Sequence, residues 1–249
     1  MGIAVGRVAQ AAQPGGDPVA ETVTVAARNR LPSDVVGELM DVLAGQPRIV
    51  VCDLNGMALS PHTMADVFAP VAPYLTCWPG TLVVACVPHP DRHLALVSAA
   101  IPRRLLVHAE CPDGVEEAHR LLSPLEHVTT HLAPVPEAAG QARMFTVRTL
   151  RDWDLHSAVG PASVVVSELV TDSLVHARTV LSLSLSRCED RLRIAVHDHG
   201  GGRPFTDTEE RFDEVEGHGM VLVQTLSLRW GVFPAHSRGK TVWAVLDAR

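Results

Sequence analysis

The sequence has few aromatic residues and no clusters of positive charge. Phe, Trp and Tyr make up 4% of its 249 residues, so we expect a core built from Ala, Val and Leu. The formal net charge is −7, and the densest basic spots are pairs such as Arg103-Arg104 and Arg191/Arg193. This charge balance argues against a basic nucleic-acid-binding surface, and we expect no nucleic-acid partner.

Cys-x-x-Cys motifs and apolar runs of membrane-spanning length are also missing from the sequence. The five cysteines form no Cys-x-x-Cys pair, which argues against a zinc or disulfide framework and predicts reduced thiols. No segment has the layout of a secretory signal, and no apolar run is expected to span a membrane. We therefore expect a cytoplasmic protein without a membrane partner. Its oligomeric state stays open, and a homodimer is among the alternatives.

The first half of the chain alternates apolar runs with amphipathic segments. Residues 1–19 are expected to form a flexible segment or an edge strand, because Pro and paired Gly interrupt regular structure. Ser33 is expected to cap the first helix. The predicted strands are 21–26, 49–54, 81–87 and 105–108, and the predicted helices are 33–43, 63–75, 93–100 and 114–122. This alternation predicts an α/β domain with a largely parallel sheet over residues 20–123.

A second domain is expected over residues 127–249. The predicted strands are 128–132, 179–186, 191–197, 230–234 and 241–246, and the predicted helices are 137–150, a helix through residue 168, and 217–228. The whole chain is therefore expected to be a two-domain α/β protein.

Three polar residues of this second half, Glu168, Asp172 and His176, are spaced four apart. On a helix this spacing places them along one face, which by itself is most often a solvated face. Further along, a strand of alternating apolar residues ends in Asp198 and three glycines. A polar helix face beside an acidic, glycine-rich strand end predicts a nucleotide pocket.

Four segments in this order resemble the motifs of the histidine-kinase-type (GHKL) ATPase fold: residues 167–177, 198–204, 216–226 and 238–246. Specifically, the chain resembles the anti-sigma-factor serine kinases of Gram-positive bacteria, especially those common in actinomycetes. The resemblance covers residues 127–249 and implies a Bergerat-type α/β sandwich, with a mixed sheet covered by helices on one face. Residues 48–56 are similar to STAS domains of the anti-anti-sigma type, which implies a STAS-like first domain.

The resemblance implies a site for ATP and Mg²⁺. Glu168 would be the general base for the incoming hydroxyl, and Asp172, where the family has Asn, would bind the metal. Asp198 would accept a hydrogen bond from the adenine amino group, and Thr241 would support the same edge of the base. Residues 206–216 would form a lid. The other nucleotide-binding positions carried over are His176, Gly200, Gly202, Gly217, His218, Gly219 and Met220.

The implied activity is transfer of the ATP γ-phosphate to a Ser or Thr of a STAS-type antagonist. Such a kinase acts in a partner-switching pathway that regulates transcription through a sigma factor. Because Asp172 adds a negative charge beside the triphosphate, a second hypothesis stays open. In that hypothesis the protein is a non-catalytic, ATP-responsive scaffold or partner-binding module. In the first domain Thr63 has the spacing of the STAS phosphoacceptor and Ser60 is the nearest serine, while helix capping is the alternative role for either.

Other chemistry around Asp198 is less consistent with the sequence. His197 and His199 flank Asp198, but strand alternation places both opposite it, so no compact metal-ligand set is expected. Residues 199–202 match an esterase oxyanion loop, but the chain has no Gly-x-Ser-x-Gly elbow. Residues 239–241 resemble the end of a P-loop, but Pro234 stands where the first glycine is required.

Overall fold

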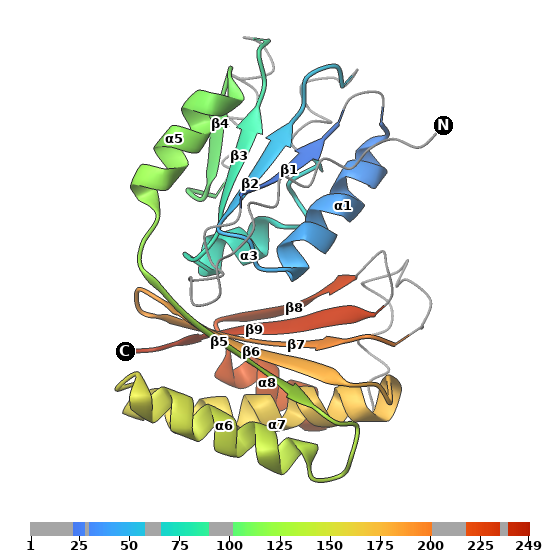
Figure 1. Ribbon diagram of the computed structural model, residues 1–249, viewed down its shortest axis with the longest axis vertical. Helices are drawn as coiled ribbons and strands as arrows, with labels where there is room; N and C mark the ends of the chain where they lie inside the picture. Colours follow the sequence, from blue (N-terminus) through green and yellow to red (C-terminus); the bar gives the residue numbers. More distant parts are fainter. Residues whose placement is uncertain (1–21, 28–29, 58–65, 90–101, 201–217, 235–238) are drawn as a thin grey trace, which may run out of the picture. The chain divides into compact units, whose positions relative to one another are not determined.

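A computed structural model of the chain describes residues 22–27, 30–57, 66–89, 102–200, 218–234 and 239–249. The chain divides into two compact units, Met1–Ser123 and Pro124–Arg249. The first contains a 4-stranded sheet and the second a 5-stranded sheet, each with its own helices (Figure 1). The protein therefore belongs to the α/β class, as the sequence predicts.

The sheet of the first unit is parallel throughout. Its strands lie side by side in sequence order, and each neighbouring pair is parallel. They are β1 (Thr22–Ala26), β2 (Ile49–Asp53), β3 (Leu82–Cys86) and β4 (Leu105–His108). The prediction of a largely parallel sheet is confirmed. Strands β2 and β3 are nearly continuous apolar runs because both faces of a parallel sheet are covered by helices.

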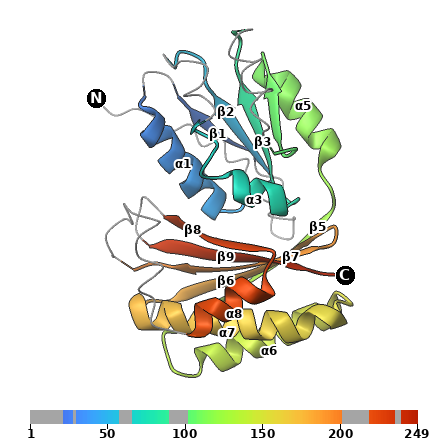
Figure 2. The same cartoon turned by 180° about the vertical axis from the view of Figure 1, so that it is seen from behind.

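Helix α5 (Cys111–Leu121) covers one face of this sheet, and helix α1 (Pro32–Ala44) lies over the other (Figures 1 and 2). Against α5 pack residues that alternate along β2 and β3, namely Ile49, Val51, Leu82, Val84 and Cys86. Cys52 points the opposite way. Burial, with a smaller effect of Glu38 on α1, raises the pKa of its thiol to about 12.

Three helix boundaries in this unit differ from prediction. Helix α1 begins at Pro32 with Leu31 as its N-cap, so the predicted Ser33 cap is wrong; proline suits a first turn because it has no N–H to satisfy. The predicted helix over 63–75 is interrupted by turns at 67–71, which include Pro70, and α3 (Ala72–Cys77) follows. Helix α5 begins at Cys111, ahead of the predicted start at Gly114. The predicted helix over 93–100 lies outside the described residues.

The sheet of the second unit is antiparallel throughout, and the expected mixed sheet is wrong. Its strand order is β5-β6-β7-β9-β8, and all neighbouring pairs are antiparallel. The strands are β5 (Leu125–Leu132), β6 (Leu181–Cys188), β7 (Arg191–Asp198), β8 (Arg229–Pro234) and β9 (Lys240–Asp247). No parallel pair forms in this sheet because β9 lies between β7 and β8. These two strands run in the same direction but do not pair.

Three helices cover one face of this sheet (Figure 1). They are α6 (Ala138–Asp152), α7 (Val159–His176) and α8 (His218–Leu226). Alternate residues of the strands point into the core beneath them, for example Leu192, Ile194 and Val196 of β7 and Val242, Ala244 and Leu246 of β9. By the same alternation, Asp198 at the end of β7 and Lys240 at the start of β9 point to the helix-covered face.

The stretch His156–His176, which contains α7, is the one described helix long and apolar enough to cross a membrane by length and composition. It is an exception to the expectation that no such run exists. Its residues Val165, Val166, Leu169 and Val170 are buried in the core of the second unit. A core helix satisfies the same criteria, so the composition of α7 alone does not indicate a membrane span.

Candidate functional site

The carboxylate of Glu168 lies against the first turn of α8. A Cβ on Gly219 would collide with Oε2 of Glu168, so the space that Gly219 leaves free is taken by this carboxylate. A negative group is favoured there because the N–H groups at the start of a helix carry partial positive charge. The structure thus brings the predicted general base to the helix start that the sequence predicts for phosphate binding.

Asp198 is a buried carboxylate held between two glycines. It is 3% exposed, and its Oδ1 accepts a hydrogen bond from the backbone N–H of Gly200 at 3.2 Å. Gly239 has a φ of +98°, and a Cβ there would overlap the carbonyl oxygen of Asp198. Only glycine fits such a close approach with a left-handed backbone. A carboxylate has two oxygens with several lone pairs, so Asp198 has capacity left to accept a bond from a ligand.

The register of β7 and β9 places Lys240, and not Thr241, on the side of Asp198. Asp198 lies opposite Lys240, and His197 lies opposite Thr241. Successive residues of a strand point to opposite faces, so Thr241 shares the face of His197. Its Oγ1 is 2.9 Å from Nδ1 of His197. The structure therefore does not place Thr241 on the face of Asp198, where it was predicted to support the same edge of the adenine base.

Asp172 faces two basic side chains. Its Oδ2 is 3.8 Å from Nζ of Lys240, and its Oδ1 is 3.4 Å from Nε2 of His176. Asp172 and His176 therefore share one face of α7, as their spacing predicts. Lys240 is a site residue that sequence reasoning missed. Counting alternate positions back from Val242 along the last strand would have placed it on the inner face.

This arrangement does not fit Mg²⁺ at Asp172. Nζ of Lys240 lies 3.8 Å from Oδ2 of Asp172, so a divalent cation at this carboxylate would stand beside a like charge. Among the described residues, no group of three or more His, Cys, Asp or Glu side chains could hold a metal ion. The rings of His197 and His199 pack edge to face, with centroids 4.5 Å apart.

The remaining predicted positions are only partly described. Met220, in the first turn of α8, packs against the core, and His218 is the first residue of that helix. Gly202 and Gly217 lie outside the described residues, as does the predicted lid over 206–216. The described part of the site is therefore formed by α7, the ends of β7 and β9, and the start of α8.

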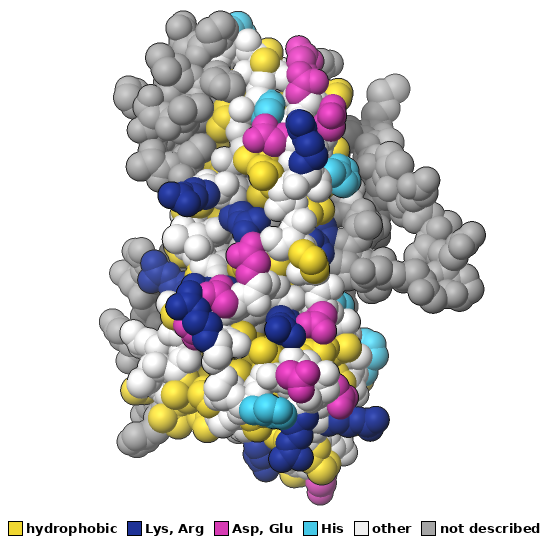
Figure 3. Space-filling view, turned by 90° about the vertical axis from the view of Figure 1, so that its left-hand side faces the viewer, with side chains coloured by type: hydrophobic (Ala, Val, Ile, Leu, Met, Phe, Trp, Pro, Cys, Tyr) yellow, Lys and Arg dark blue, Asp and Glu magenta, His cyan; other side chains and the backbone are white. Residues whose placement is uncertain are grey.

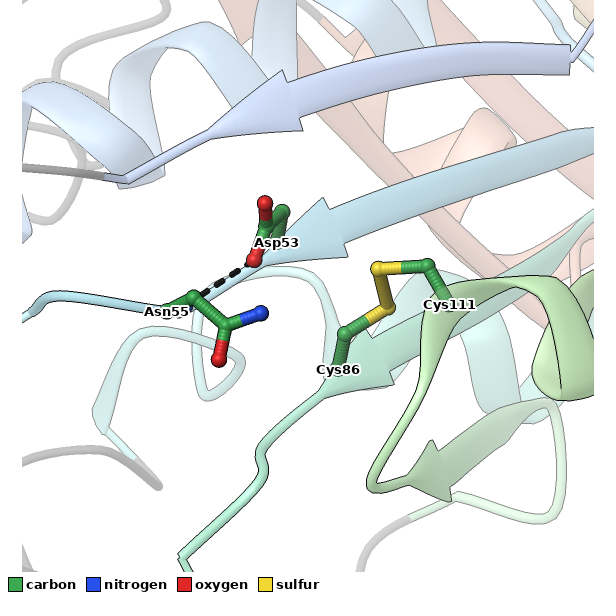
Figure 4. Close-up of a disulfide and its surroundings, with 4 residues drawn as sticks. All are labelled: Asp53, Asn55, Cys86 and Cys111. Carbon is green, nitrogen blue, oxygen red and sulfur yellow. Dashed lines mark hydrogen bonds between the residues drawn. A yellow bond between two sulfur atoms is a disulfide. The ribbon is translucent and has the colours of Figure 1, made fainter.

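In the first unit, Ser60 and Thr63 lie outside the described residues, but the neighbouring sheet edge is described (Figure 4). Oδ1 of Asp53, at the end of β2, accepts a hydrogen bond from the backbone N–H of Asn55 at 3.0 Å. Beside it, Cys86 of β3 forms a disulfide with Cys111 of α5, with a Cα–Cα distance of 5.3 Å. The expectation of reduced thiols is wrong for this pair, because the fold brings together cysteines 25 residues apart.

A separate shallow groove lies along α6 and contains none of the predicted site residues. Arginines and apolar side chains line it together, among them Arg143, Met144 and Val147, with Ser163 from α7. In the view of Figure 3, acidic and basic side chains are interspersed on the visible face. We assign no function to this groove.

No protein-family model matches this chain, and no curated protein sequence matches it.

Proposed function

We propose that this protein is an ATP-binding regulator of the anti-sigma-factor kinase type, with a STAS-like first unit and a histidine-kinase-type ATPase second unit. In this proposal it acts on STAS-type anti-anti-sigma proteins, and through them on a sigma factor, in a partner-switching pathway. The observation that carries the proposal is the meeting of distant motifs: the Glu168 carboxylate lies against the first turn of α8, and Asp198 is buried between Gly200 and Gly239.

The fold supports this proposal. A five-stranded antiparallel sheet with three helices on one face leaves the ends of β7 and β9 next to α7. The close approach of Gly239 to Asp198 and of Gly200 to Ala177 removes side chains from the space around the buried carboxylate. A buried carboxylate selects a ligand that donates hydrogen bonds, and the adenine amino group is such a donor.

In the kinase hypothesis, Glu168 accepts the proton of the attacking Ser or Thr hydroxyl. The hydroxyl oxygen forms a bond to the γ-phosphorus of ATP while the bond between that phosphorus and the β-γ bridging oxygen breaks, and ADP leaves. Glu168 is placed for this role because α8 would hold the phosphates with its first N–H groups, and the carboxylate lies next to them.

One observation favours the second candidate, an ATP-responsive scaffold that binds its partner without phosphotransfer. Lys240 and His176 face both oxygens of Asp172, the residue that would otherwise hold the metal of a phosphotransferase. The two candidates share the nucleotide site and differ only in whether the phosphoryl group moves.

Incubation with γ-labelled ATP, magnesium and candidate STAS proteins separates the two candidates. The kinase hypothesis predicts label transfer that disappears with Glu168→Ala, and this result would exclude the scaffold. The scaffold hypothesis predicts tight ATP binding without transfer, and transfer gained by Asp172→Asn would exclude a wild-type kinase. Asp198→Asn is the control for the site. It should abolish ATP binding in both hypotheses, and unchanged affinity would contradict the proposed pocket.

A further inference from the structure

Lys240 is the only lysine of the chain, and it lies inside the candidate site. Its side chain is 16% exposed, and its ammonium group is 3.8 Å from Oδ2 of Asp172, whose side chain is 22% exposed. A lysine on a protein surface is usually solvated and mobile. This one is largely covered, so its position is set by the fold.

The fold fixes Lys240 through its neighbours on the strand. Gly239, immediately before β9, has a left-handed backbone and lies against the backbone of Asp198. Lys240 follows as the first residue of the strand. Lys240 pairs with Asp198 across the two strands, and its side chain points to the same face of the sheet as that of Val242. This is the face covered by α7, which carries Asp172.

The cluster of Lys240, Asp172 and His176 has consequences for a metal ion. A divalent cation bound to Asp172 would stand a few ångström from the Lys240 ammonium and would be repelled by it. Conversely, a lysine ammonium is itself a common ligand of nucleotide phosphates. The positive charge that a nucleoside polyphosphate requires at this place is therefore already supplied by the chain.

We infer that Lys240, held by Asp172, replaces the bridging divalent cation, so that the site binds a nucleoside polyphosphate without Mg²⁺. This inference rests on the proposed nucleotide site and assigns Lys240 as its phosphate-binding cation. It favours the scaffold candidate, since binding and release of the nucleotide would then not require the metal of a phosphotransferase.

The first test is ATP binding by the full chain, measured by isothermal titration calorimetry in EDTA and in magnesium chloride. The wild-type affinity should differ by less than about threefold between the two buffers, which corresponds to about 0.65 kcal/mol. Lys240→Met should weaken binding by about tenfold or more in EDTA, and magnesium should restore part of the loss, because the freed Asp172 carboxylate can then bind the metal. Lys240→Arg should keep metal-independent binding, because it keeps the charge.

A second measurement uses the single lysine directly. Protein labelled with ¹³C-lysine should give one lysine Cε signal, and this signal should shift on titration with ATP in EDTA. In the double variant Asp172→Asn/Lys240→Met, both charges are absent, and ATP binding should require magnesium. This variant also tests whether losses in Lys240→Met come from the unpaired Asp172.

Two results would count against these assignments, and they are distinguishable. If wild-type protein binds ATP only with magnesium and Lys240→Met binds equally well, the role of Lys240 is wrong while the proposed nucleotide site stands. If folded wild-type protein binds no nucleotide in either buffer, the proposed function itself is wrong, and the inference falls with it.

Discussion

Gly219 and Glu168 share one space: the missing side chain of the glycine is where the carboxylate of the glutamate lies. The two residues are distant in the sequence, on α8 and α7, and neither alone predicts the contact. Because the collision would involve the end of a flexible side chain, an added methyl group would displace the carboxylate rather than the helix.

This contact predicts a coupling between the two positions. In a Glu168→Ala background, Gly219→Ala should stabilise the fold by about 0.5–1 kcal/mol, the usual gain of Ala over Gly in a helix. In the wild-type background the gain should be lost, because the Glu168 carboxylate must move away from the helix start. Urea unfolding of the four proteins measures the difference. Gly160→Ala, in the first turn of α7 with no atom within 4 Å of the new Cβ, is the matched control. Equal effects of Gly219→Ala in both backgrounds would contradict the contact.

The approach of Gly239 to Asp198 predicts a larger loss. Gly239→Ala introduces a Cβ at a φ of +98° and against a backbone oxygen, which cannot rotate away. We expect a destabilisation of about 2 kcal/mol or more. We also expect loss of ATP binding, because the last residue of β7 and the first residue of β9 must move apart. Gly140→Ala is the control, since the nearest atom to its new Cβ is the end of an arginine at 3.9 Å. Urea unfolding and calorimetry report both effects. A Gly239→Ala protein as stable as Gly140→Ala would show that the close approach is not formed.

The disulfide between Cys86 and Cys111 predicts sensitivity to reductant. The bond closes a loop with a sequence separation of 25, so its reduction should destabilise the first unit by roughly 2–4 kcal/mol. Thermal unfolding with and without reductant measures the loss, and the variant Cys86→Ser/Cys111→Ser should not respond to reductant. Cys52, Cys77 and Cys188 are free. Alkylation of unfolded, unreduced protein should therefore label three thiols. Labelling of all five cysteines without prior reduction would contradict the bond.

The sequence predicts the elements of this fold better than the relations between them. Periodic apolar runs locate β2, β3, β4 and β7, because a buried strand leaves its pattern in the residues themselves. The antiparallel order of the second sheet leaves no such pattern, since it depends on β9 entering between β7 and β8. The disulfide is hidden for the same reason: Cys86 and Cys111 meet only because the start of α5 packs beside the end of β3.

The candidate site shows the same limit at the level of single residues. The spacing of Asp172 and His176 on α7 predicts their shared face, because helical geometry is local. Lys240 was missed because its importance depends on a register between two strands, which places it and not Thr241 beside Asp198. A motif matched by residue type selects the threonine. Strand alternation places the lysine on the inner face, and the strand pairing sets it opposite Asp198.

The pair of Asp190 and Arg249 predicts a pH-dependent contribution to stability. Nε of Arg249 donates a hydrogen bond to Oδ2 of Asp190 at 2.7 Å. This bond, helped by the charges of Arg191 and Arg249, lowers the pKa of the Asp190 carboxyl below its ordinary value of 3.8. Because the pKa is lower in the folded state, the stabilisation is fully present above the unfolded pKa. It is lost as the pH falls through the folded pKa.

Arg249→Ala should therefore lower the urea midpoint at pH 7, and the difference from wild type should vanish as the pH falls through the lowered pKa of Asp190 in the folded state. Arg249 is exposed and Asp190 is partly exposed, so the effect should be small and should shrink further in roughly 0.5 M NaCl, which screens surface charges. Arg148→Ala, at an exposed position of α6, controls for the loss of one positive charge. A difference between Arg249→Ala and wild type that stays constant from pH 7 down to pH 2 would show that Asp190 does not contribute through its charge.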